Sequence, residues 1–226
     1  MAKDDVRRNL LNAAGETFAE LGYRRATVRQ ICRKAGANVA AVNYYFGDKQ
    51  RLYIEAVKHA RRMRAERQPL PQWSESTPPA EKLRMVIHTL LRRMLGEDGD
   101  PWQARLVVRE IIEPTRACEE MVQEAFRPMF ERILGIVREM VPSDTPVHRA
   151  EQIVFSIISQ CVYYRVHGAL LAMLVSQREL REHYRLEQVA EHICQFSLAA
   201  LGHGCMPGRP AARGVECHDK LVEDRT

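Results

Sequence analysis

Apolar residues recur at helical spacing along almost the whole chain, and no segment alternates as a half-buried strand would. Leu10, Ala14, Phe18 and Leu21 share one face of a helix expected at about residues 6–21. Prolines and glycine-rich stretches separate the later segments, because proline lacks the N–H that a helix interior needs. Further helices are expected at about 48–67, 80–95, 102–113, onward to 141 with a kink at Pro128, 148–175 and 186–201. The pattern predicts an all-α protein.

The most specific local pattern lies between residues 27 and 49, where two short helices flank a tight turn and a third begins. Thr27 can cap the first short helix, and Gln30 three positions later completes a capping box. A glycine in the turn accepts a left-handed backbone without steric cost. Asn38 is a good N-cap for the second short helix. Two helices joined in this way form a helix-turn-helix, whose second helix enters the DNA major groove.

The second short helix has two distinct faces. Val42 and Phe46 are four residues apart, so they share a face that is expected to pack inward. The other side carries Ala40, Ala41, Asn43 and Tyr44. Small side chains admit the backbone to the groove, and amide and phenol groups hydrogen-bond to bases or phosphates. An ordinary helical hairpin, whose exposed aromatics contact a neighbouring helix, is the alternative.

This motif and its flanks resemble the TetR family of bacterial regulators over residues 6–58. The segment AAVNYYFGDK at 40–49, together with REIIEPT at 109–115, is most similar to the CecR-like subgroup. Asn43 departs from the family, which usually has tyrosine there. The resemblance implies that the second helix reads bases while its neighbours grip phosphates. The expected DNA-binding residues are Thr27, Arg29, Asn38, Val39, Ala40, Ala41, Asn43, Tyr44, Tyr45 and Lys49.

The resemblance also implies an organisation in domains. A three-helix DNA-binding domain is expected at 1–50, and a helical ligand-binding and dimerisation domain at 51–202, with the helix at about 48–67 as the link. Residues 203–226 are expected to form a flexible tail. Residues 148–201 carry helices that are apolar on more than one face, so a partner subunit or the monomer's own core can cover them. The family builds a homodimer from these helices, and a dimer matches a palindromic operator.

TetR-like proteins usually bind a small molecule in the second domain, and polar or aromatic residues on apolar helices are the candidates. They are Trp102, Arg109, Glu113, Phe126, Gln160, Tyr163, Tyr164 and His167. An ion pair between Arg109 and Glu113, four residues apart, is the competing explanation for those two. Adjacent positions on a helix diverge, so only one of Tyr163 and Tyr164 is expected to line a given cavity. The subgroup suggests an unknown hydrophobic or drug-like inducer and control of efflux transporter genes.

Charge supports DNA as the partner. Residues 1–67 hold 15 Lys or Arg against 7 Asp or Glu, a net charge of +8, whereas the whole chain carries +5. The remaining residues are therefore net −3, so the basic excess lies with the helix-turn-helix, where phosphates need it. The basic run at 58–67 fits equally well with a solvated helix face.

Other functions find little support in the sequence. There is no GxSxG, HExxH, P-loop or Rossmann glycine pattern, so an enzyme is not expected. The six cysteines form no CxxC, and neither redox sensing nor a cofactor is expected. His203, Cys205, Cys217 and His218 lie in a Gly-, Pro- and Arg-rich segment that favours a tail over a metal site.

No signal peptide and no apolar stretch of the roughly 20 residues that a membrane span needs is evident, which predicts a cytoplasmic location. The preferred hypothesis is a dimeric, ligand-released repressor. An activator, or an architectural DNA-binding protein without a ligand, is the alternative.

Overall fold

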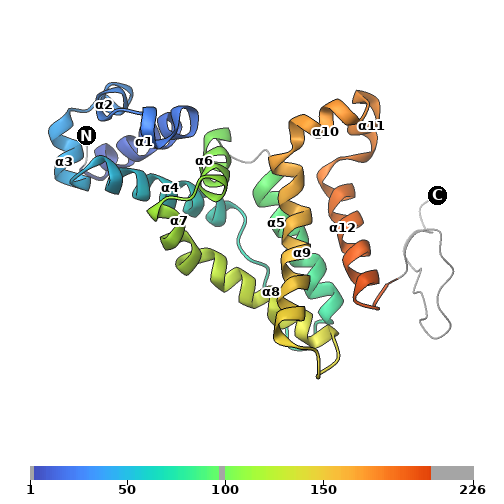
Figure 1. The fold of residues 1–226 in the computed structure, drawn as a ribbon. Coiled ribbons are helices and arrows are strands. Elements are labelled where there is room, and N and C mark those ends of the chain that lie inside the picture. Colours follow the sequence, from blue (N-terminus) through green and yellow to red (C-terminus); the bar gives the residue numbers. More distant parts are fainter. Residues whose placement is uncertain (1–2, 97–99, 205–226) are drawn as a thin grey trace. The chain divides into compact units, whose positions relative to one another are not determined.

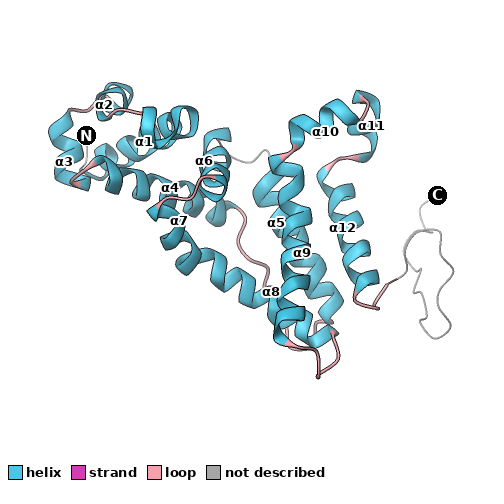
Figure 2. Cartoon of the chain, in the orientation of Figure 1, coloured by secondary structure: helices cyan, strands magenta, loops and turns pink. Residues whose placement is uncertain are grey.

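The computed structural model describes residues 3–96 and 100–204, and every regular element in these ranges is a helix (Figures 1 and 2). The predicted all-α class is confirmed. The chain divides into two compact units. The first comprises Met1–Leu70 and Arg92–Glu131, and the second Pro71–Leu91 and Arg132–Thr226. The tail expected from residue 203 lies, apart from residues 203 and 204, outside the described residues.

The helices of the first unit follow in chain order. They are α1 (Lys3–Arg25), α2 (Val28–Ala35), α3 (Val39–Phe46), α4 (Lys49–Arg67), α6 (Pro101–Ile112) and α7 (Arg116–Met121), followed by a short π-helical turn, η1 (Val122–Phe126). The π turn ends two residues before Pro128, where a kink is expected because proline has no N–H for a regular helical bond. The helix expected to continue from 114 to 141 is therefore divided.

The first unit is built around α1, which packs against α2, α4 and α6. The predicted apolar face of α1 is confirmed at Leu10, Ala14 and Phe18, which are fully buried, whereas Leu21 at its end is half-buried. Phe18 meets the Tyr53 ring edge-on, with 4.9 Å between the centroids. At Gly22 (φ 74°) the helical geometry of α1 breaks, one residue after its predicted end. The buried core runs without interruption from the helix-turn-helix into α6 and α7.

Most of α5 (Pro79–Leu95) and α8 (Arg127–Met140) belong to the second unit, with α9 (Val147–Val166), α10 (Gly168–Leu174), α11 (Gln177–His183) and α12 (Leu186–Ala200). Ion pairs join these helices at the surface of the unit. The Lys82 ammonium lies 2.7 Å from the Glu139 carboxylate and links α5 to α8, while Arg84 pairs with Glu191 on α12. Helix α12 packs on α9.

The prediction of a single helix at 148–175 is wrong. It breaks at His167, and α9 and α10 meet at a bend of 75°. The apolar pattern runs straight through Gly168, so periodicity alone gives no sign of the bend. Helix α11 was also not predicted, although Ser176 caps it by accepting a hydrogen bond from the Glu179 N–H, a Ser-x-x-Glu pattern that is visible in the sequence.

No single helix in the described ranges has both the length and the apolar character to cross a membrane. Helices α9 and α10 pass that test only when their bent pair is taken together.

A close approach between α1 and α6 gives a test of the first unit's packing. An ideal Cβ on Gly15 would lie 2.1 Å from a ring carbon of Trp102, so we expect Gly15→Ala to destabilise the protein by about 1–3 kcal/mol through overpacking. Gly135→Ala is the matched control. Its new Cβ meets nothing within 4 Å, so the better helix propensity should stabilise the protein by about 0.5–1 kcal/mol. Urea denaturation measures both, and equal effects would contradict this packing.

Candidate nucleic-acid interface

The helix-turn-helix is held by its caps. The predicted capping box is present. The Thr27 hydroxyl accepts the backbone N–H of Gln30 at 3.3 Å, and the side-chain carbonyl of Gln30 accepts the backbone N–H of Thr27 at 2.9 Å. Gly36 ends α2 at φ 63°, a left-handed conformation that glycine adopts without strain. Asn38 then caps α3 by accepting the Ala41 N–H at 2.9 Å. These contacts fix the angle at which α3 leaves the turn.

Helix α3 presents a defined outer face. Val42 and Phe46 are buried in the core of the first unit, as predicted. We call Val39, Ala40, Asn43 and Tyr44, all exposed, the outer face of α3. Tyr44 is 67% exposed, an unusual state for a large aromatic side chain in a folded unit. The arrangement suits insertion in a major groove, because small residues allow close approach while Asn43 and Tyr44 supply polar groups.

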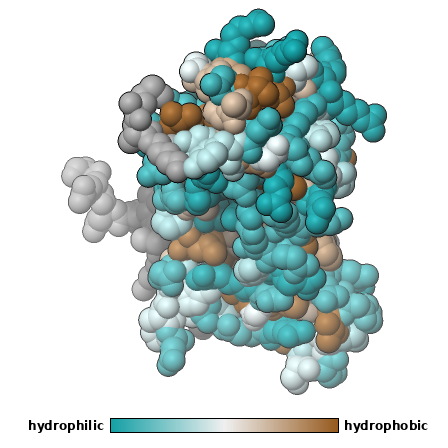
Figure 3. Space-filling view, turned by 90° about the vertical axis from the view of Figure 1, so that its left-hand side faces the viewer, coloured by the Kyte–Doolittle hydropathy of each residue, from teal (hydrophilic) through white to brown (hydrophobic). Residues whose placement is uncertain are grey.

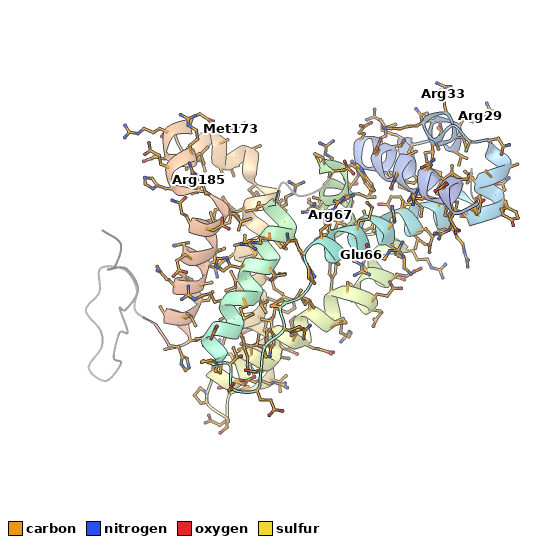
Figure 4. The ribbon with its side chains drawn as sticks, turned by 180° about the vertical axis from the view of Figure 1, so that it is seen from behind. Arg29, Arg33, Glu66, Arg67, Met173 and Arg185 are labelled. Atoms are coloured by element: carbon orange, nitrogen blue, oxygen red, sulfur yellow. The ribbon has the colours of Figure 1, made fainter. Side chains whose placement is uncertain are left out.

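The other expected DNA-binding residues surround this outer face. Thr27 and Asn38 are exposed, and Ala41 and Tyr45 are half-buried. Arg29 and Arg33 point away from α2 (Figure 4). Figure 3, which shows the side of the molecule on which α2 and α3 lie in Figure 1, has a largely hydrophilic surface broken by separate apolar patches.

Lys49 differs from the others in pointing partly inward. Its ammonium lies 3.5 Å from the Arg24 carbonyl oxygen and 4.7 Å from the centre of the Tyr23 ring. An ammonium has three donors, so a contact with phosphate remains compatible with this position.

The expected ligand residues fall into two separate groups. Trp102, Arg109, Glu113 and Phe126 belong to the first unit. Trp102 is buried against Gly15, and the Arg109 guanidinium lies over Gly22 and pairs with Glu113 at 3.7 Å, as the competing explanation holds. Phe126 is half-buried against the core.

The second group lies on α9. A pocket of about 370 Å³ brings together Gln160, Tyr163 and Tyr164, which are joined there by Ser159, His192 and Ile193. The expectation that only one of the two tyrosines lines a given cavity is wrong, because Tyr163 and Tyr164 both line this pocket together with His192 and Ile193 of α12. His167 is stacked on Tyr163 with 4.7 Å between the ring centroids, but it does not line the pocket. The periodicity of a single helix does not indicate that Ser159 or His192 would line this pocket.

A buried carboxylate connects α4 to α7 within the first unit. Glu110 is completely buried, and its Oε2 accepts the Tyr53 hydroxyl at 2.5 Å. Its Oε1 accepts the Thr115 N–H at 2.6 Å and the Cys118 N–H at 3.0 Å. Burial and the neighbouring carboxylate raise the pKa of the Tyr53 phenol above its ordinary value, so Tyr53 stays a donor. Glu110 and Thr115 both belong to REIIEPT, so this segment forms the α6–α7 turn.

The cysteines in the described ranges show no sign of activation. Cys32, Cys161 and Cys194 are buried, and burial raises the pKa of both Cys161 and Cys194 to about 12. They are therefore thiols at neutral pH, not reactive thiolates. Of the suggested tail metal ligands, Cys205, Cys217 and His218 lie outside the described residues. Within these ranges no three His, Cys, Asp or Glu side chains gather as a metal site would require.

The fold and the outer face of α3 define a helix-turn-helix DNA-binding protein. Comparison with known families makes this more specific. Residues 10–56 match the model of the bacterial regulatory proteins of the tetR family, and residues 79–201 match the C-terminal domain of the HTH-type transcriptional dual regulator CecR. The chain belongs to the TetR family of transcriptional regulators and is CecR-like, as the sequence resemblance implies. Members of this family are not enzymes.

Individual relatives agree with this assignment. CecR of Shigella flexneri is 25% identical over 178 residues, covering 72% of this chain and 77% of CecR. The regulator BetI of Agrobacterium fabrum is 22% identical over 183 residues, covering 80% of this chain and 87% of BetI. Among solved structures, a TetR-like regulator from Rhodococcus sp. RHA1 shares the fold with a TM-score of 0.64 at 15% identity, covering 87% of this chain and 96% of that one.

The Glu110 network predicts a large effect of a single side chain. Glu110→Ala leaves the Tyr53 hydroxyl and the Thr115 N–H without this acceptor and takes one of two acceptors from the Cys118 N–H, so we expect a loss of about 2–4 kcal/mol in the free energy of unfolding. Glu113→Ala on the same helix removes only a surface pair and should stay within about 0.5 kcal/mol. Denaturation followed through Trp102 emission in a Trp73→Phe background measures both. A similar stability for the two variants would exclude a structural role for Glu110.

Proposed function

We propose that this protein is a homodimeric regulator that binds a palindromic operator through α3 and is released from it by a small hydrophobic ligand. The outer face of α3 carries the proposal, because Tyr44 and Asn43 are held outward while Val42 and Phe46 anchor the helix. The expected DNA contacts are those of the helix-turn-helix residues named from the sequence, with Thr27, Arg29, Tyr45 and Lys49 at phosphates. A cytoplasmic location is part of this proposal, because the protein must reach chromosomal DNA.

A second copy of the chain is the partner proposed for the second unit. Val154, Ile157 and Cys161 of α9 are buried within the monomer, so part of the apolar character of this helix serves its own core. Phe155 and Tyr163 on α9 and Phe196 on α12 are instead exposed, by 59%, 41% and 45%. We call these three the apolar surface of the second unit. Exposed aromatics on two packed helices are typical of an interface between subunits.

The pocket between α9 and α12 is the proposed ligand site. Its walls combine aromatic rings with a few polar groups from Gln160, Ser159 and His192, as in many small-molecule sites. Tyr163 belongs both to the pocket and to the apolar surface of the second unit. A ligand there would therefore act on the dimer, and a ligand that favours one spacing of the two DNA-binding heads shifts the population towards it.

Repression is proposed from the resemblance to the family, and efflux transporter genes as targets from the resemblance to the CecR-like subgroup. The printed name of CecR describes a dual regulator, which makes activation at some promoters the second candidate.

DNA recognition is tested by fluorescence anisotropy with DNA from upstream of the protein's own gene and with scrambled DNA. We expect a preference of about a thousandfold or more at near-physiological salt. Tyr44→Ala should weaken operator binding at least about tenfold, because it removes a contact of the reading helix. Tyr184→Ala, an exposed tyrosine of the second unit, is the control and should bind as the wild type. Equal, weak binding to both DNAs would favour an architectural protein.

Dimerisation is tested by sedimentation at micromolar concentration. The wild type should sediment as a dimer, and Phe196→Glu should shift it towards monomer because a carboxylate would be buried without a partner. Arg138→Glu, on the exposed side of α8, is the control for the change of charge. A monomeric wild type would defeat the proposed dimer.

A further inference from the structure

A groove of about 850 Å³ lies within the first unit, beside the outer face of α3. Asn43 and Tyr44 line one side of it. The first turns of α4, Arg7 of α1, and Arg116 and Glu120 of α7 line it as well. Helix α7 is not part of the helix-turn-helix, so the groove joins the reading helix to an element outside it.

The acidic groups of the groove already have partners. Asp48 accepts the Arg51 N–H at 2.7 Å as the cap of α4. Glu55 pairs with Arg7 at 3.0 Å, and Glu120 pairs with Lys58 at 3.2 Å. Glu55 and Glu120 therefore have a basic partner at close range, although Lys58 is shared with Glu124 at 2.6 Å, whereas Asp48 keeps its charge as a helix cap.

Two arginines of the groove have no such partner. The side chains of Arg51 and Arg116 are exposed, and neither guanidinium forms an ion pair or side-chain hydrogen bond within the described part of the chain. A guanidinium presents five donors in a fork that matches phosphate oxygens. Two such groups lining one open groove suit a polyanion that binds along it.

DNA is the polyanion expected at this groove, because the proposed base-reading residues Asn43 and Tyr44 also line it. We propose that Arg116, together with Arg51, binds the phosphate backbone of the operator, so that α7 extends the DNA contact beyond the helix-turn-helix. This inference rests on the proposed function. It also gives the Glu110 network a role in DNA binding, since Thr115, which Glu110 holds at two atoms, directly precedes Arg116.

The test measures operator affinity across a series of KCl concentrations for the wild type, Arg116→Ala and Arg51→Ala. Each variant should weaken binding several-fold and reduce the slope of log K against log salt by about 0.9, the value for one released counterion. The loss should be similar on operator and scrambled DNA, because a phosphate contact carries no sequence information. Arg116→Lys keeps the charge and should keep the slope.

Arg105→Ala is the matched control, an exposed arginine of the first unit that does not line the groove. If it reduces the slope as much as Arg116→Ala does, the effect is one of net charge and the inference fails. It also fails if Arg116→Ala, with an unchanged melting temperature, keeps the wild-type affinity and slope. A melting temperature that inorganic phosphate raises in the wild type but not in Arg116→Ala, with DNA affinity unchanged, would reveal a small-anion site instead.

The two proposals fail in distinguishable ways. A wild type that does not prefer operator over scrambled DNA defeats the proposed function. Specific binding that is lost in Tyr44→Ala but retained in Arg116→Ala defeats only the contact through α7.

Discussion

The first unit depends on one buried carboxylate. Glu110 has no exposed surface, and four donors converge on its two oxygens from Tyr53, Thr115 and Cys118. A charge without water is costly unless hydrogen bonds replace its hydration, so these donors are required wherever Glu110 is buried. The helix that leaves the helix-turn-helix and the α6–α7 turn are thereby held in one arrangement. The aromatic contacts of Tyr53 with Phe18 and Tyr23 extend this constraint to α1.

This constraint explains why α6 and α7 belong to the same compact unit as the DNA-binding helices. The domain boundary expected near residue 50 is a division by function, and it stays a prediction. The packing of the helices does not stop there, because α4 continues across this position and packs against α6. Trp102 and Arg109 illustrate the difference. When only their own helix is considered, both look like residues of a ligand pocket. In the structure, however, Trp102 packs against Gly15 and Arg109 against Gly22 of α1, because neither glycine has a side chain to occupy that space.

The second unit uses its apolar residues in two ways. Val154, Ile157 and Ile193 fill the interior between helices, while Phe155 and Phe196 remain at the surface. The sequence placed all of α9 and α12 among candidates for the dimer interface, because two apolar stripes on one helix look alike until the neighbouring helices are in place. Only the exposed stripe is available to a partner, and the pocket with Tyr163 lies along it.

The sequence by itself determined the all-α class, the helix-turn-helix, its capping residues and the buried pair Val42 and Phe46, because caps and periodicity act within a few residues of each other. It also contained the family resemblance. Tertiary structure alone decided the bend at His167 and the pocket that Tyr163 and Tyr164 both line. It also decided which groups donate hydrogen bonds to Glu110 and that Arg116 lines the same groove as α3. These features join residues far apart in the chain, whose distances depend on how helices pack and leave no periodic trace in the sequence.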